Sequence, residues 1–180
     1  MTGVNGGAVD RWYLGPMDYQ RQVSRALDDE HRANLELLER VEQAFARAPK
    51  AGCAHDGKLA QLAGALARHL EQEIDRHFDF EETELFPRMR EAGDGDMAAL
   101  LAEEHASIRA VAGEALPLAR AAAAGTLDDA GWAKLKRAGL ELVERQVAHI
   151  QKETMALLPL LEDLLDGETD RELAFAYAAG

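Results

Sequence analysis

The sequence is poor in cysteine. Cys53 is its one thiol, so an internal disulfide is excluded, and neither a CxxC nor a CxC zinc motif is present. The sequence also lacks a basic start followed by an apolar run, and no stretch approaches the ~18 uninterrupted apolar residues of a membrane span. We therefore expect a soluble, cytoplasmic protein in a reducing compartment.

Basic residues are scarce relative to acidic ones. The chain has 20 Lys and Arg against 33 Asp and Glu, which gives a formal net charge of −13. Phosphate backbones and anionic lipid surfaces both require positive potential, so nucleic acid and membrane are not expected as partners. With 180 residues, 47% of them apolar, the chain is long enough to bury the core of one globular domain.

No strand-like alternation competes with a helical pattern in which apolar residues recur at spacings of three and four. This pattern predicts four helical segments, at about residues 18–48, 56–93, 94–125 and 126–167, with Asp56 as a plausible N-cap and Pro87, Pro117 and Pro159 as sites of kinks or helix ends. Short connections favour an all-α, antiparallel up-down-up-down four-helix bundle over residues 18–167. Residues 1–17 are expected to form an irregular N-terminal arm, and the tail of residues 168–180 is compatible with a short extra helix.

A weak internal repeat relates the two halves of the chain. The sequence His77-Phe78-Asp79-Phe80-Glu81, followed by Leu-Phe-Pro, is echoed 72 residues later from His149 to Glu153, followed by Leu-Leu-Pro. Glu30-His31 on the first segment is similarly echoed by Glu104-His105 on the third. Each half therefore supplies one His and one His-x-x-x-Glu motif, and the members of the set are His31, His77, Glu81, His105, His149 and Glu153.

These six residues interrupt the apolar stripes of their segments. His31, for example, follows Leu27 by four positions and precedes Leu35 by four. A carboxylate that faces an apolar interior costs several kcal/mol unless it is protonated, paired or bound to metal. A rise of ~1.5 Å per residue places all four His roughly 26 to 35 Å from the same end of the bundle, so the six side chains are predicted to meet in one layer.

Four imidazoles and two carboxylates are too many ligands for one zinc ion and too rich in nitrogen for calcium or magnesium. Two ions bridged by the Glu carboxylates use the whole set, and imidazole with carboxylate suits iron. We therefore predict two iron ions with an oxo or hydroxo bridge. Manganese, zinc or a mixed site satisfies the same donor set.

With these motifs in place, the sequence resembles the hemerythrin-like, or HHE cation-binding, domains over about residues 20–165. The resemblance is carried by the order His, His-x-x-x-Glu, His, His-x-x-x-Glu and by the flanks HFDFEETELFP and EEHASIR. It implies a non-haem di-iron site on a four-helix bundle, with the six residues as ligands and the two Glu bridging.

The sequence departs from the oxygen-carrying hemerythrins, which have a second His four residues along the third helix and a final His-x-x-x-x-Asp. Here Arg109 stands at the first of these positions, and the final spacing is shorter. Fewer imidazoles leave more open positions, which favours reaction with dioxygen, hydrogen peroxide or nitric oxide over oxygen storage. The protein is expected to bind or react with these small oxidants and to serve in sensing, in detoxification or in the response to iron-linked stress. An electron-donor protein is expected as a further partner. Two alternatives remain open: a ferritin-like bundle that oxidises or stores iron, and an interaction module with a structural metal ion.

Four polar residues lie near the predicted ligand row. His69 is expected on a solvated face, because regular helix geometry turns it some 80° away from His77. Glu73, Glu82 and Gln146 are weaker candidates for residues that orient a ligating imidazole or add to the ligand set.

Overall fold

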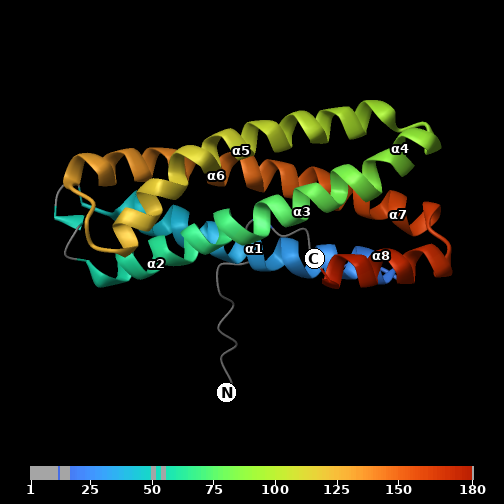
Figure 1. Cartoon of the computed structure of the whole chain (residues 1–180), viewed down its shortest axis with the longest axis horizontal. Coiled ribbons are helices and arrows are strands. Elements are labelled where there is room, and N and C mark those ends of the chain that lie inside the picture. Colours follow the sequence, from blue (N-terminus) through green and yellow to red (C-terminus); the bar gives the residue numbers. More distant parts are fainter. Residues whose placement is uncertain (1–11, 13–16, 50–51, 54–55, 180) are drawn as a thin grey trace, which may run out of the picture.

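The computed structural model describes residues 12, 17–49, 52–53 and 56–179, and the described part of the chain is helical with no strand. The expected irregular arm falls mostly on residues that lie outside this description. Figure 1 shows long helical rods lying along the long axis, with successive rods running in opposite directions and the final helix beside the start of the first. The prediction of an all-α bundle is confirmed.

The first rod is α1 (Gln22–Arg47) and the third is α5 (Gly95–Ala123). The second rod consists of α2 (Gly57–Arg68), η3 (His69–Glu73), α3 (Ile74–Phe80), η4 (Glu81–Leu85) and α4 (Phe86–Ala92). The fourth rod consists of α6 (Asp129–Lys152), η5 (Glu153–Leu157) and α7 (Leu158–Leu164). The tail forms α8 (Gly167–Ala179), which packs against α1. The elements η3, η4 and η5 are single π-helical turns within otherwise α-helical rods.

Local signals set several of the rod ends. Asp56 caps α2, because its Oδ1 accepts hydrogen bonds from the backbone N–H groups of Lys58 and Leu59 at 2.9 and 3.2 Å. The second rod ends at Gly93, whose φ of 100° is readily adopted by glycine. The fourth rod begins later than expected, at Asp129, because Asp128 is its cap and the Thr126 hydroxyl donates back to the carbonyl of Ala121.

The second and fourth rods continue through Pro87 and Pro159, where proline was expected to kink or end them. Pro87 and Pro159 have no N–H to donate to the carbonyl four residues earlier. The preceding turn widens instead, so that the N–H of Phe86 bonds the carbonyl of Glu81 and that of Leu158 bonds the carbonyl of Glu153. Glu81 and Glu153, the glutamates of the two His-x-x-x-Glu motifs, are therefore each the first residue of a π-turn.

The hydrophobic core is divided into two clusters along the bundle. One contains Leu38, Leu66 and Leu142, and the other contains Leu27, Leu101 and Leu157. On the first and third rods, the predicted His lies between residues of the two clusters in sequence, and on the second and fourth rods the His-x-x-x-Glu motif overlaps the change from one cluster to the other. The layer is therefore enclosed by apolar side chains on both sides.

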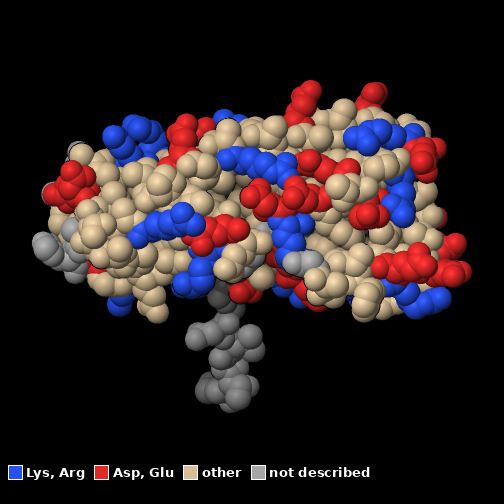
Figure 2. Space-filling view, in the orientation of Figure 1, with Lys and Arg blue, Asp and Glu red and all other residues tan. Residues whose placement is uncertain are grey.

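The outside of the bundle is charged. Figure 2 shows Asp and Glu side chains interspersed with Lys and Arg over one face of the molecule. Within the described part of the chain, no helix combines the length and apolar character that crossing a bilayer requires.

Candidate metal centre

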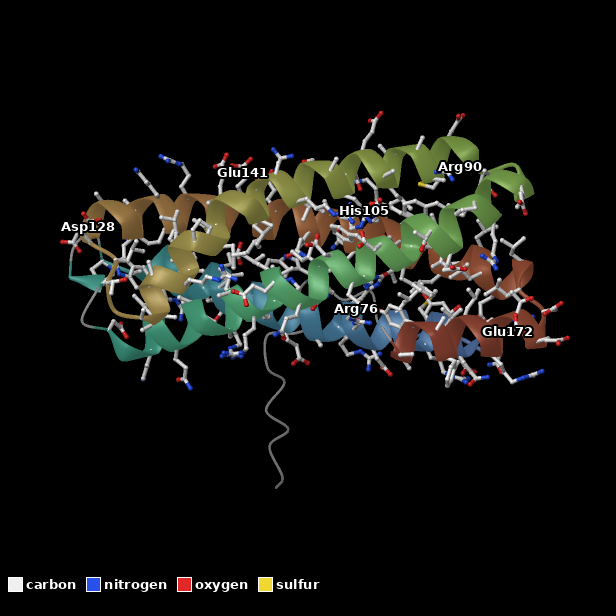
Figure 3. All side chains as sticks on the ribbon, in the orientation of Figure 1. Arg76, Arg90, His105, Asp128, Glu141 and Glu172 are labelled. Atoms are coloured by element: carbon white, nitrogen blue, oxygen red, sulfur yellow. The ribbon has the colours of Figure 1, made fainter. Side chains whose placement is uncertain are left out.

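All six predicted side chains meet at one level inside the bundle. Each of the four rods contributes at least one of them, and none is more than 4% exposed. They form two groups of closely spaced donor atoms, in each of which the atoms lie within 4.8 Å of one another. Glu81 and Glu153 belong to both groups. Figure 3 shows His105 among the rods, whereas Asp128, Glu141 and Glu172 lie at the periphery.

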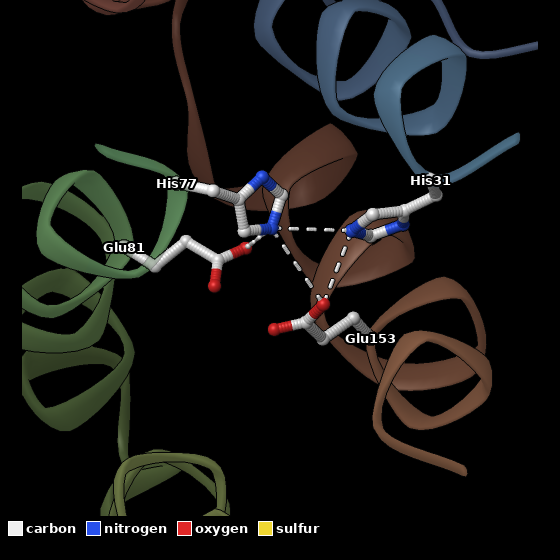
Figure 4. Close-up of side chains that lie close together, drawn as sticks. All are labelled: His31, His77, Glu81 and Glu153. Atoms are coloured by element: carbon white, nitrogen blue, oxygen red, sulfur yellow. Dashed lines mark hydrogen bonds and ion pairs between the residues drawn. The ribbon is translucent and has the colours of Figure 1, made fainter. Parts of the chain in front are cut away.

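We call the first group subsite 1. It contains His31 and His77, whose Nε2 atoms are 3.4 Å apart. His31 Nε2 lies 3.1 Å from Glu153 Oε2, and His77 Nε2 lies 3.2 Å from Glu81 Oε1. Figure 4 shows these side chains converging, with His31 from the first rod, His77 and Glu81 from the second and Glu153 from the fourth.

Subsite 2 contains His105 and His149, whose Nε2 atoms are 3.0 Å apart. His105 Nε2 lies 3.3 Å from Glu81 Oε2, and His149 Nε2 lies 2.9 Å from Glu153 Oε1. Each carboxylate thus directs one oxygen to subsite 1 and the other to subsite 2. This is the arrangement by which a carboxylate bridges two neighbouring cations.

The chemistry of the donor set fits a pair of metal ions. The four carboxylate oxygens of Glu81 and Glu153 are buried without a hydrogen-bond partner in the described part of the protein. Buried anionic oxygens without a donor are costly, and a cation between each oxygen and the facing imidazoles removes that cost. Imidazole nitrogen combined with carboxylate oxygen suits iron, manganese or zinc.

Three of the four imidazoles are held from behind by a carboxylate. Nδ1 of His77 lies 3.1 Å from Glu30, Nδ1 of His105 lies 2.8 Å from Glu82, and Nδ1 of His149 lies 3.0 Å from Glu104. An Nδ1–H that donates to a carboxylate leaves the Nε2 lone pair for a metal ion and makes the ring a stronger ligand.

Glu82 was predicted as a candidate orienting residue, and its contact with His105 supports that role. The roles of Glu30 and Glu104 were not predicted. The signal was present, because each of these residues immediately precedes a His in the repeated Glu-His dipeptide. Each holds the His of the following rod in its own half, which is a pairing across rods that helix periodicity does not report.

The three outer carboxylates are in turn held by cations. Arg76 binds Glu30, Arg109 Nη1 lies 2.6 Å from Glu82, and Lys152 Nζ lies 2.6 Å from Glu104. Burial opposes ionisation of Glu30, but hydrogen bonding to His77 and the nearby charges outweigh it and lower its pKa to about 2. Arg109 stands where the oxygen-carrying hemerythrins have a second His, and here it binds Glu82, which holds His105 of subsite 2.

In the metal-free cluster, an imidazole and a carboxylate have pKa values that are shifted in opposite directions. Burial alone would lower the pKa of His149, but the carboxylates of Glu153 and Glu104 outweigh it and raise this pKa to about 9. Burial would likewise raise the pKa of Glu153, whereas the surrounding imidazoles, His149 first, lower it well below its usual range. The negative potential that favours protonated imidazoles here also favours a metal cation in place of those protons.

His31 differs from the other three imidazoles because its Nδ1 has no hydrogen-bond partner among the described residues. The internal repeat relates Glu82, which holds His105, to Thr154 on the fourth rod. Thr154 is buried, and its carbonyl accepts a hydrogen bond from the Tyr19 hydroxyl at 3.3 Å. Subsite 1 therefore has one imidazole that is fixed from behind and one that is not.

The expectation that His69 faces solvent is wrong. This residue is 1% exposed, and its Nε2 lies 3.2 Å from the side-chain amide of Gln146. The π-turn η3 begins at His69 and absorbs one extra residue, which reduces the angle between His69 and His77 from some 80° to about 20°. Gln146 consequently pairs with His69 rather than orienting a ligand, and the side chain of Glu73 lies outside the description.

Comparison with known proteins gives one informative result. The family model described as the hemerythrin HHE cation binding domain matches residues 22–161, a range that includes both subsites. No match was found among curated proteins or among solved structures. Because the family match spans most of the sequence, the chain belongs to the hemerythrin HHE cation-binding family.

Proposed function

We propose that this protein is a non-haem di-iron protein that binds or reacts with dioxygen, hydrogen peroxide or nitric oxide. The observation that carries the proposal is the division of each buried carboxylate between two pairs of imidazoles. One ion in each subsite receives two imidazole nitrogens and two carboxylate oxygens. Four protein ligands leave coordination positions open for a small molecule.

Iron is the proposed metal because it supplies one-electron chemistry toward such oxidants, and the donor set suits it. His31, His77, His105 and His149 would hold the ions, and Glu81 and Glu153 would bridge them. The outer carboxylates keep three imidazoles oriented. Manganese in both subsites fits the same donor set.

The surroundings of subsite 1 favour a small reactant. A cavity of about 10 Å³, which is room for one water-sized molecule, is bordered by His31, His77 and Glu153. Ile74, Phe78 and Ile150 also line it. Such a small space favours a reactant of few atoms over a bulky substrate, so diatomic oxidants and peroxide are the proposed ligands.

Turnover with an oxidant requires that electrons return to the iron. We therefore include an electron-donor protein in the proposal. The excess of acidic over basic residues favours a donor with a basic contact surface.

The test is to load the protein with ferrous iron without oxygen and to mix it rapidly with each oxidant in turn. We expect near-ultraviolet absorption from coupled ferric ions after dioxygen or peroxide, and a visible iron–nitrosyl spectrum after nitric oxide. Glu153→Gln removes a bridging carboxylate and is expected to abolish the coupled-ferric absorption. Glu144→Gln, an exposed change on the same rod, is the matched control.

Two results would contradict this proposal. Continued uptake and oxidation of many iron ions per chain would indicate ferritin-like storage. A metal ion whose removal unfolds the bundle, in a protein that reacts with none of the three oxidants, would indicate a structural site.

A further inference from the structure

The C-terminal helix α8 lies outside the residues matched by the family model and yet reaches the metal centre. The matched range ends at residue 161, whereas α8 spans Gly167–Ala179. Figure 1 shows α8 lying beside the beginning of α1. Its buried side chains are Asp170, Leu173 and Tyr177, which follow one another at helical spacing.

Polar contacts fix α8 against α1. The Asp170 carboxylate accepts hydrogen bonds from the backbone N–H groups of Gln22 and Val23, at 2.9 and 3.0 Å. The start of α8 is held by Asp166, whose Oδ1 accepts from the N–H of Thr169 at 2.8 Å. The position of α8 along α1 is therefore defined by directional bonds as well as by packing.

Tyr177, the last buried residue of α8, contacts His77 of subsite 1 and Glu30, which holds that imidazole. The Tyr177 hydroxyl donates to Oε2 of Glu30, and its oxygen lies 3.0 Å from Nδ1 of His77. Glu30 Oε1 faces the same Nδ1 at 3.1 Å, so the three groups form a closed set of contacts. The phenol ring lies 4.7 Å from the ring of Phe80 and 4.6 Å from the Arg76 guanidinium, measured to the ring centroid.

No phenol takes part in the corresponding contacts of subsite 2 within the described residues. His105 is held by Glu82 and His149 by Glu104, with Arg109 and Lys152 behind them. The Tyr177 contact is thus an addition to the repeated pattern, made by a helix that follows the four rods.

We propose that Tyr177 is a positioning residue of subsite 1, which fixes Glu30 and His77 so that Nε2 of His77 is presented to the ion. This inference rests on the proposed metal function. It makes α8 part of the metal centre rather than a cover for the bundle end, because the hydroxyl contacts both Glu30 and His77, whereas a packing contact alone would orient neither group.

The test uses Tyr177→Phe in the full chain, because this change keeps the ring and its packing and removes the hydroxyl. The metal-free protein is titrated with cobalt(II), and binding is followed by visible absorption and calorimetry. Loss of such an outer contact typically weakens metal binding about 10- to 100-fold. We expect a weakening of about 10-fold for one of the two cobalt ions, with the other ion and the metal-free melting temperature nearly unchanged.

Two control variants identify the subsite and the specificity of the effect. Glu104→Gln removes the charge that holds His149 and is expected to weaken the other cobalt ion. Phe175→Leu changes a 77% exposed residue of α8 and is expected to leave both ions unaffected.

The outcomes separate this inference from the proposed function. Unmodified protein that takes up no cobalt and no iron would overturn both. Two ions bound equally well by the unmodified protein and by Tyr177→Phe would overturn the positioning role alone. A variant that weakens both ions together and lowers the metal-free melting temperature would assign Tyr177 a structural role and also overturn the inference.

Discussion

At the scale of single residues, the two subsites have the same ligand types but different support. His105 and His149 of subsite 2 are both held by a carboxylate at Nδ1, whereas His31 of subsite 1 is not. The difference traces to one position of the internal repeat, where Thr154 stands in place of an acidic residue. Ligands that are already oriented lose less conformational freedom on binding.

Subsite 2 is therefore expected to fill first. In a cobalt(II) titration we predict two steps whose dissociation constants differ by about 10-fold, the usual lower range for an outer-shell contact. His31→Ala should remove the weaker step and leave the stronger one, and His105→Ala should do the reverse. A stronger step that disappears in His31→Ala would contradict this order.

The clustering of the six side chains was predictable, and part of their surroundings was not. The repeat and the position of each His in an apolar stripe indicate all six residues without a structure. The anchoring role of Glu30 depends on a neighbouring rod, which periodicity within one helix does not encode. His69 was misplaced because the expectation assumed uniform α-helix geometry across η3.

At the scale of elements, the close approach of α1 and α6 depends on a glycine. A Cβ added to Gly139 would lie 2.5 Å from Cε2 of Phe45, and that ring is itself buried. Gly113 on α5 is exposed, and a Cβ there would meet no atom within 4 Å. The two positions therefore form a matched pair of helical glycines in opposite environments.

Alanine at these two positions is expected to have opposite effects. Gly139→Ala should lower the free energy of unfolding by about 1–3 kcal/mol, because overpacking displaces the Phe45 ring. Gly113→Ala should raise it by about 0.5–1 kcal/mol, because alanine favours the helix. Urea unfolding of the metal-free protein measures both, and a Gly139→Ala protein as stable as the parent would contradict the packing argument.

The junction of α8 with α1 provides a second prediction at this scale. The N-cap residue of α1, Arg21, makes no side-chain capping hydrogen bond. The carboxylate of Asp170 on α8 accepts hydrogen bonds from the first turn of α1 instead. Asp170→Ala should therefore lower the free energy of unfolding by about 1–2 kcal/mol. Glu172→Ala, an exposed change on the same helix, is the control, and equal stabilities of the two variants would refute the capping role.

At the scale of the whole molecule, the structure is a bundle whose apolar core is interrupted by one charged layer. The all-α bundle follows from apolar spacing and short connections. The docking of α8 did not follow from its sequence, because it depends on Asp170 and Tyr177 reaching groups more than 140 residues earlier in the chain. The identity of the ions is equally absent from the sequence, because several metals share this donor set.

Removing the ions should destabilise the whole bundle, because the buried carboxylates then lose their metal cations. A site whose metal ion is present at a free concentration 100 times the dissociation constant contributes about 2.7 kcal/mol to stability. We expect a chelator to lower the melting temperature and added ferrous or zinc ions to restore it. An unchanged melting temperature, after analysis has shown that metal was removed, would contradict this coupling.

The central claim is that six inward-facing side chains hold two ions. Its most direct test is the metal content of the full chain after loading with ferrous iron without oxygen and removal of free metal. The account predicts about two irons per chain for the unmodified protein and fewer for Glu153→Gln. A folded, unmodified protein that retains no iron after this treatment would contradict it.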